Sequence, residues 1–262
     1  MTGPRFAANL KWLFTEVDFE ARFEAAAAAG FAGVEYPSPY AYPAARLRRR
    51  LDDAGLTQVL LNSPKGAPGT PARAGLACIP GLEAEFRVGI ERGLAYADAL
   101  GCGLLHVVGG IVPRGVGRDR AFARYVTNLA WAAERAAGTG VRLVVEAQNG
   151  RDAPGFVLGS QAQAAAAVEA VGADHLGLLL DFYHLQVAEG DLVRTYRRLA
   201  DRVFHLQIAD PPSRHEPGTG EIGWRAVFRA VRDSGYDGWI GCEYAPLAGT
   251  VPGLGWMSAV AE

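Results

Sequence analysis

The sequence contains very little lysine or cysteine, although it is rich in arginine and alanine. Lys11 and Lys65 are the only two lysines among its 26 Lys and Arg residues, a bias that we attribute to overall composition rather than to function. Cys78, Cys102 and Cys242 are odd in number and far apart. They exclude a disulfide framework and a thiolate zinc site, so we expect reduced cysteines in a cytoplasmic protein.

Long apolar runs and basic stripes are also missing. No stretch reaches the roughly 18 apolar residues that a membrane-spanning helix needs, and the start of the chain does not resemble a signal peptide. The formal net charge is −2, with the arginines spread along the chain. We therefore expect a soluble protein with neither a membrane nor a nucleic-acid partner, and the sequence leaves a homo-oligomer open.

What the sequence does contain is an alternation of short apolar runs with longer amphipathic segments. The runs predict strands at Arg5–Asn9, Ala32–Tyr36, Thr57–Leu61, Gly103–Val108, Val141–Glu146, Leu176–Asp181, Val203–Ala209 and Trp239–Tyr244. The segments between them predict helices at Asp18–Ala29, Pro43–Ala54, Leu82–Leu100, Asp119–Ala137, Gln161–Val171, Leu192–Ala200 and Trp224–Asp233. Such alternation is typical of parallel β-sheet.

Eight such units in 262 residues favour one (β/α)8 barrel domain over residues 1–262. An open doubly wound sheet is the alternative, but no GxGxxG follows the first strand. The long Gly- and Pro-rich segment from Asn62 to Gly81 is unusual for a connection in a compact domain. We expect it to be functional or to carry short structure of its own.

Polar side chains occur where the predicted strands end. The first four strands carry Asn9, Glu35, Asn62 and His106, and the last four carry Glu146, Asp181, Gln207 and Glu243. In a barrel these strand ends meet at one mouth, where active sites are built. Three converging carboxylates would repel one another unless a cation lay between them, so we expect the last four side chains to hold a divalent metal.

The expected ligands are all oxygen atoms, which favours Mg²⁺ or Mn²⁺ over Zn²⁺. The alternative to a metal site is that these four residues are separate barrel residues, each with an arginine partner. Among other candidates, His184 would reach the substrate from the loop after the sixth strand, and Arg214 and Lys65 would bind an anionic group. The alternative is a structural role for His184 and a solvent-exposed position for Arg214 and Lys65. His106 is as consistent with the barrel interior as with a site, and for His205 a structural role is favoured.

The chain resembles the hydroxypyruvate isomerase family, within the xylose-isomerase-like barrel superfamily. The resemblance runs nearly end to end. It is carried by RFAANLKWLF (5–14), FAGVEYPSPY (31–40), GLACIPGLEAEFR (75–87), VVEAQN (144–149), DFYHLQ (181–186), HLQIADPPSRHEPGTGEI (205–222) and GWIGCEY (238–244). The loop NSPKGAPGTPARAG departs from the sequence that is usual in the family, which leaves the substrate of this chain open.

This resemblance implies an isomerase that interconverts hydroxypyruvate and tartronate semialdehyde, with Glu146 and Glu243 as the catalytic pair. Related ketose 3-epimerases coordinate metal through positions that match Glu146, Asp181, Gln207 and Glu243, usually with His at the third. Their substrate-contacting His and Arg match His184 and Arg214. Asp152 stands where many of them carry a second acid near the substrate.

The expected reaction is a proton transfer between adjacent carbons through a metal-stabilised enediolate of a small keto or aldehyde acid. Metal ligation and proton transfer make opposite demands on the pKa of a glutamate, so we expect one of the two to loosen from the metal. A 2-oxo-tetronate isomerase and a ketose 3-epimerase are the nearest alternatives. A DNA-repair endonuclease on this barrel would need more than five histidines and a basic surface. A non-catalytic sensor would not require two proton-transfer carboxylates.

Overall fold

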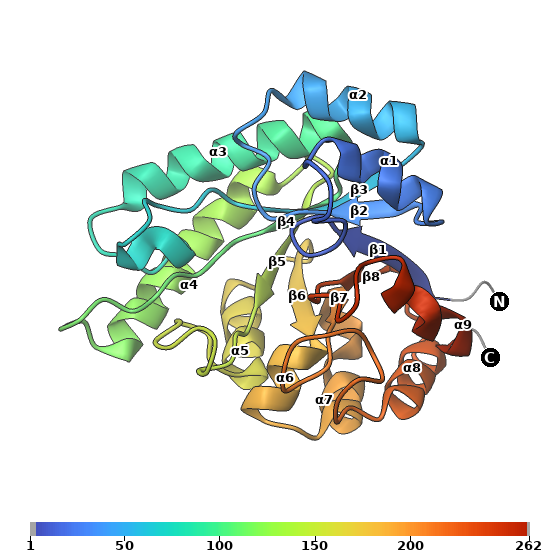
Figure 1. Cartoon of the computed structure of the whole chain (residues 1–262). Coiled ribbons are helices and arrows are strands. Elements are labelled where there is room, and N and C mark those ends of the chain that lie inside the picture. Colours follow the sequence, from blue (N-terminus) through green and yellow to red (C-terminus); the bar gives the residue numbers. More distant parts are fainter. Residues whose placement is uncertain (1–3, 261–262) are drawn as a thin grey trace.

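The computed structural model describes residues 4–260 and contains a closed barrel of parallel strands (Figure 1). The strands are β1 (Arg5–Asn9), β2 (Gly33–Glu35), β3 (Thr57–Asn62), β4 (Leu104–His106), β5 (Arg142–Glu146), β6 (Leu176–Asp181), β7 (Val203–Ile208) and β8 (Trp239–Cys242). Pairing of β1 with β8 closes the ring, so the predicted barrel is confirmed and the open sheet is excluded. The first three and last two residues of the expected 1–262 domain lie outside the described residues.

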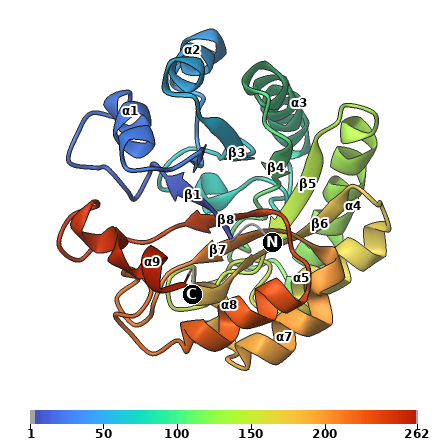
Figure 2. The same ribbon diagram turned by 90° about the vertical axis from the view of Figure 1, so that its right-hand side faces the viewer.

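Helices surround the strands (Figure 2). They are α1 (Ala21–Ala28), α2 (Ala44–Ala54), α3 (Glu83–Leu100), α4 (Arg118–Ala136), α5 (Gln161–Val171), α6 (Phe182–Ala188), α7 (Leu192–Leu199), α8 (Trp224–Asp233) and α9 (Trp256–Val260). Short 3-10 helices are η1 (Pro71–Ala74), η2 (Ala200–Arg202) and η3 (Pro252–Gly255). Within residues 4–260, no helix combines the length and apolar character that crossing a membrane requires.

Several predicted boundaries need correction. The segment after β6 is a helix, α6, and not the loop that we expected to carry His184. The Asp181 carboxylate accepts a hydrogen bond from the backbone N–H of Tyr183 (2.8 Å), which caps this helix immediately after the strand. The eighth strand ends at Cys242, so Glu243 lies one residue beyond it. The long segment after β3 contains η1, in line with the expected short structure.

The interior of the barrel has an apolar layer below a polar one. Ala7, Leu104, Val144 and Leu179 belong to the apolar cluster. Two residues after each of them comes a polar residue; these are, respectively, Asn9, His106, Glu146 and Asp181. Because side chains two residues apart on a strand share a face, the polar set lies on the same interior face, nearer the carboxyl ends of the strands. The apolar layer therefore closes one end of the barrel, and polar groups line the other.

Glu35 is a buried carboxylate of the polar layer, with 1% of its surface exposed. It accepts hydrogen bonds from Asn9 Nδ2 (2.9 Å), Gln207 Nε2 (2.7 Å) and His205 Nε2 (2.6 Å). A buried carboxylate is costly unless such donors satisfy it. Room for it comes from β8, because a Cβ atom on Gly241 would lie 2.3 Å from Glu35 Oε1. Glycine at this position is therefore a packing requirement of the Glu35 network.

We predict that Gly241→Ala destabilises the protein by about 1–3 kcal/mol, the usual cost of overpacking a core. The matched control is Gly103→Ala, because a Cβ atom at Gly103 meets nothing within 4 Å. Urea unfolding of both variants measures the difference. Equal stability of the two would show that the Glu35 side chain moves aside without cost.

Candidate active site

The strand-end side chains line one cavity of about 190 Å³ at the carboxyl end of the barrel. Its lining includes Glu146, Gln207, Glu243, His184, Arg214, Asp152 and Lys65, which are seven of the eight predicted site residues. Asp181 is fully buried behind this surface. Drug-sized ligands occupy pockets of about 300–1,000 Å³, so a cavity of this size suits a smaller molecule.

Glu146, Asp181 and His184 form the most compact polar group. Their ligand atoms lie within 4.8 Å of one another, and all three side chains are buried. His184 Nε2 is 3.8 Å from Glu146 Oε1 and 3.7 Å from Asp181 Oδ2. Helix α6 produces this arrangement because it places His184 one turn after Asp181. His184 therefore joins two of the four predicted ligands and faces them with one ring nitrogen.

Hydrogen bonds from Asn149 define the tautomer of His184. The backbone N–H of Asn149 donates to His184 Nδ1 (3.3 Å), and Asn149 Nδ2 lies 2.7 Å from the same atom. A backbone N–H can only donate, so Nδ1 accepts and the ring proton is on Nε2, facing the carboxylates. Burial, together with the positive charge of Arg214, lowers the pKa of His184 to about 3.

The Arg214 guanidinium is the nearest positive charge to the carboxylates. Arg214 Nη2 donates to Glu243 Oε2 (2.9 Å) and lies 3.3 Å from Asp181 Oδ2. The guanidinium also lies 5.0 Å from the centre of the Trp12 ring and 4.7 Å from that of Tyr183. Burial acts to lower the pKa of Arg214, but the charges of Glu243, Asp181 and Glu146 outweigh it and raise the pKa. Arg214 is therefore engaged by carboxylates of the protein itself.

The surroundings of Glu146 raise the pKa of its carboxyl group. Burial raises its pKa to about 8, and the charges of Glu243 and Asp181 add to the rise, although Gln148 Nε2 donates a hydrogen bond to it (2.7 Å). Burial also raises the pKa of Asp181. The positive charge of Arg214 thus does not outweigh the effect of burial on these two carboxyl groups. A cation placed among these side chains would favour their charged forms.

Gln207 presents a defined end of its amide to the cavity. Its Nε2 is committed to Glu35, because a carboxylate only accepts hydrogen bonds. The amide oxygen is therefore the end left for another partner. His205, two residues earlier, bonds to Glu35 and is fully buried, in line with the structural role favoured for it.

Asp152 and His106 lie at the margins of the acidic group. Tyr183 Oη donates to Asp152 Oδ2 (2.7 Å), and Arg214 Nη1 is 3.9 Å from the same oxygen. His106 Nε2 lies 4.0 Å from Glu146 Oε2 and has no hydrogen-bond partner among the described residues. Burial, with a smaller contribution from the charge of Lys65, lowers the pKa of His106 to about 3.

Sequence reasoning missed Trp12 and Asn149, which position other residues of the site. Trp12 Nε1 lies 3.3 Å from Glu243 Oε1, to which it donates, and its ring stacks on Arg214. Asn149 orients His184. Both residues fall within segments that carried the family resemblance, which was the one signal available for them.

Comparisons with known proteins identify the family to which the chain belongs. The sequence profile of the family described as "Xylose isomerase-like TIM barrel" matches residues 23–260. The chain therefore belongs to the xylose isomerase-like TIM barrel family, and the predicted relationship is confirmed.

Individual relatives cover nearly the whole chain. A 2-oxo-tetronate isomerase from Cupriavidus necator is 47% identical over 254 residues, which are 97% of each protein. The hydroxypyruvate isomerase of Escherichia coli is 44% identical over 253 residues, 97% of this chain and 98% of the relative. A crystal structure described as an AP endonuclease of family 2 from Brucella melitensis has a TM-score of 0.94 and 40% identity, covering 99% of this chain and all of that one.

We predict that the His184 ring stays neutral at pH 5 in metal-free protein, because its pKa is lowered to about 3. Nitrogen-15 NMR should show protonated Nε2 and unprotonated Nδ1, with the signals assigned by their loss in His184→Gln. A doubly protonated ring at pH 5 would contradict the arrangement.

Proposed function

We propose that the chain is an aldose–ketose isomerase that interconverts hydroxypyruvate and tartronate semialdehyde (2-hydroxy-3-oxopropanoate). The observation that carries the proposal is the presence of two glutamates, Glu146 and Glu243, in one small cavity. The name of the 44% identical relative from Escherichia coli supports the same reaction. A cavity of about 190 Å³ also suits an acid of three or four carbons.

In this reaction a proton leaves C3 of hydroxypyruvate and a proton is added to C2, while the hydroxyl proton of C3 is lost and the oxygen on C2 gains one. We assign the two carbon proton transfers to Glu146 and Glu243, the order depending on direction. A positioned carboxylate contributes about 10²–10⁴-fold to such a step. The two groups differ in their surroundings, because Glu243 is held by Arg214 and Trp12 and Glu146 by Gln148.

His184 and Arg214 fit the role of substrate contacts. The proton on His184 Nε2 is positioned to bond a substrate oxygen between Glu146 and Asp181. Arg214 holds Glu243 in place and lies beside Asp152 at the edge of the cavity. Asp152 would then accept a hydrogen bond from a substrate hydroxyl.

The side chains also fit a divalent metal, with Glu146, Asp181, Gln207 and Glu243 as its ligands. Three carboxylates and an amide whose nitrogen is engaged elsewhere offer an all-oxygen donor set, which favours Mg²⁺ or Mn²⁺. When bound, the metal would withdraw charge from the carbonyl and hydroxyl oxygens of the substrate. Burial, and then the charges of Glu243 and Asp181, raise the pKa of Glu146, and a bound cation would oppose that rise.

Isomerisation of a 2-oxo-tetronate is the second candidate. It is favoured by the name of the 47% identical relative from Cupriavidus necator. That substrate has one more carbon than hydroxypyruvate, and it requires the same proton transfer between adjacent carbons. Initial rates on the two acids distinguish these two candidate functions. Neutral ketoses, assayed alongside them, test for a 3-epimerase. The nuclease description of the Brucella structure has little support from a chain with five histidines and a net charge of −2.

We predict that Glu146→Gln and Glu243→Gln each lower kcat on the preferred acid by at least about 10²-fold, because each removes one proton-transfer group. Turnover is followed by NMR of the substrate carbons. Glu134→Gln, an exposed change on α4, is the matched control for a lost carboxylate and should keep full activity.

Circular dichroism should show that all three variants keep the native fold. Near-native rates in both active-site variants would refute the assignment of the two glutamates.

We predict that chelator-treated protein loses activity and regains it with Mg²⁺ or Mn²⁺. Independently of turnover, Mn²⁺ titrated into the treated protein should bind one site, detected by its electron paramagnetic resonance signal. Asp181→Asn and Gln207→Leu should each weaken that binding by about tenfold or more, since each removes a ligand. Unchanged Mn²⁺ affinity in both variants would place the metal elsewhere.

A further inference from the structure

Both lysines of the chain line the cavity that holds Glu146 and Glu243. The other basic residues are arginines, of which Arg214 is the one that lines this cavity among the described residues. Arginine bias explains why lysine is scarce, but it does not explain why both lysines occur at the same site. Their common location therefore calls for a reason in the chemistry of the cavity.

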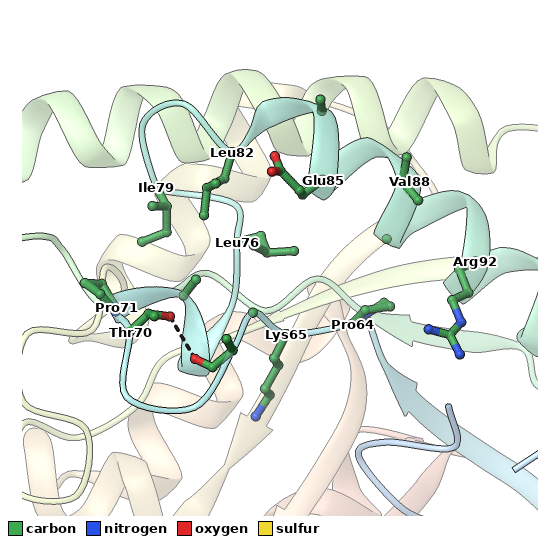
Figure 3. A pocket seen from close by; sticks show the side chains of 15 residues that line it. Pro64, Lys65, Thr70, Pro71, Leu76, Ile79, Leu82, Glu85, Val88 and Arg92 are labelled. Atoms are coloured by element: carbon green, nitrogen blue, oxygen red, sulfur yellow. Dashed lines mark hydrogen bonds between the residues drawn. The ribbon is translucent and has the colours of Figure 1, made fainter. Parts of the chain in front are cut away.

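Lys65 stands on an anchored loop. Next to it, the backbone N–H of Ser63 donates to His106 O (2.8 Å), and the N–H of Gly66 donates to Ala72 O (2.8 Å). The neighbouring groove is apolar, and Figure 3 shows the Lys65 side chain turned away from Leu76 and Ile79. Lysine commonly packs its stem on apolar surface and directs the ammonium group to a polar one.

Lys11 belongs to a different segment of the chain and lies two residues after the end of β1. Its backbone N–H donates to Asn9 Oδ1 (3.1 Å), and its Nζ lies 4.8 Å from the centre of the Trp12 ring. Trp12 also donates a hydrogen bond to Glu243. Lys11 is thereby tied to the layer of side chains around the proposed catalytic pair.

The charges of the two lysines act on each other. Burial lowers the pKa of Lys65, and the positive charge of Lys11 lowers it further, while Glu146 and Glu243 oppose the change. Two ammonium groups that line one cavity repel each other, and an anion bound between them would offset the repulsion. Arg214 differs, because Glu243 and Asp181 already neutralise it.

We propose that Lys11 and Lys65 together bind the carboxylate of a 2-oxo acid substrate, and that this pair makes the cavity select acids over neutral ketoses. The inference rests on the proposed isomerase function and deepens it. The sequence-based expectation named both Arg214 and Lys65 as binders of an anionic group, and this proposal keeps Lys65 and adds Lys11. Arg214 instead holds Glu243, and the lysines take the charged end of the substrate.

The size of the substrate is consistent with this division. In hydroxypyruvate the carboxylate is bonded directly to C2, one of the two carbons that exchange a proton. Groups that bind the carboxylate must therefore lie in the same small cavity as Glu146 and Glu243, as both lysines do. A distant basic patch on the surface would not satisfy that requirement.

The test compares an acid with its neutral counterpart in Lys11→Met and Lys65→Met. Dihydroxyacetone has the skeleton of hydroxypyruvate with a hydroxymethyl group in place of the carboxylate. In each variant the KM for hydroxypyruvate and the Kd of the unreactive acid D-glycerate, measured by calorimetry, should rise by about tenfold or more, the effect of losing a hydrogen bond to a charged group. The inhibition constant of dihydroxyacetone should stay within about twofold of wild type.

Two further variants control for charge and position. Arg73→Gln removes a positive charge from the same loop without changing the cavity lining, and it should leave the Kd of D-glycerate unchanged. Lys65→Arg keeps the charge and should retain more affinity for D-glycerate than Lys65→Met.

The outcomes separate the two proposals. If the wild-type protein converts no 2-oxo acid, the proposed function fails, and the D-glycerate titrations still decide whether the lysines bind a carboxylate. If the wild type is active but the lysine variants bind D-glycerate as tightly as Arg73→Gln does, the lysine proposal is wrong and the isomerase proposal stands. Equal weakening of dihydroxyacetone and the acid would likewise overturn it.

Discussion

Mutual repulsion of buried carboxylates is the constraint on which the site depends. Glu146, Asp181 and Glu243 meet at one end of the barrel, and Arg214 supplies a single positive charge between two of them. Glu35, which is also buried in the barrel, is stabilised in a different way, by hydrogen bonds from Asn9 on β1 and from His205 and Gln207 on β7. Two further features serve these charged groups: the glycine at position 241 leaves room for Glu35, and the rings of Trp12 and Tyr183 flank the Arg214 guanidinium.

The barrel and the location of its site could be predicted because both follow from local pattern. Apolar runs recur at the spacing of βα units, and each of the last four runs ends at or next to a residue able to bind a metal. Once the ring closes, such positions must converge, whatever their separation in the chain. The cavity lining agrees with that reasoning for Glu146, Gln207 and Glu243.

Partners across the barrel could not be predicted in the same way. Glu35 was visible as a polar residue in a strand, but its bonds to His205 and Gln207 span 170 and 172 positions. The helix after β6 was missed because Asp181 serves as both a site residue and a helix cap, and only the first role is apparent from the pattern. The common location of the two lysines could not be predicted for a related reason, since composition carries no information on where residues meet.

The scarcity of lysine also bears on how the molecule can be handled. Reagents that attach to side-chain amines find Lys11 and Lys65 as their only lysine targets, and both stand at the cavity. Labelling or immobilisation through lysine would therefore block the mouth of the barrel. A protein with many surface lysines would instead react over its whole exterior. The three cysteines are buried, so thiol reagents offer no easy alternative, and a tag intended to leave the cavity open needs a new attachment point on an outer helix.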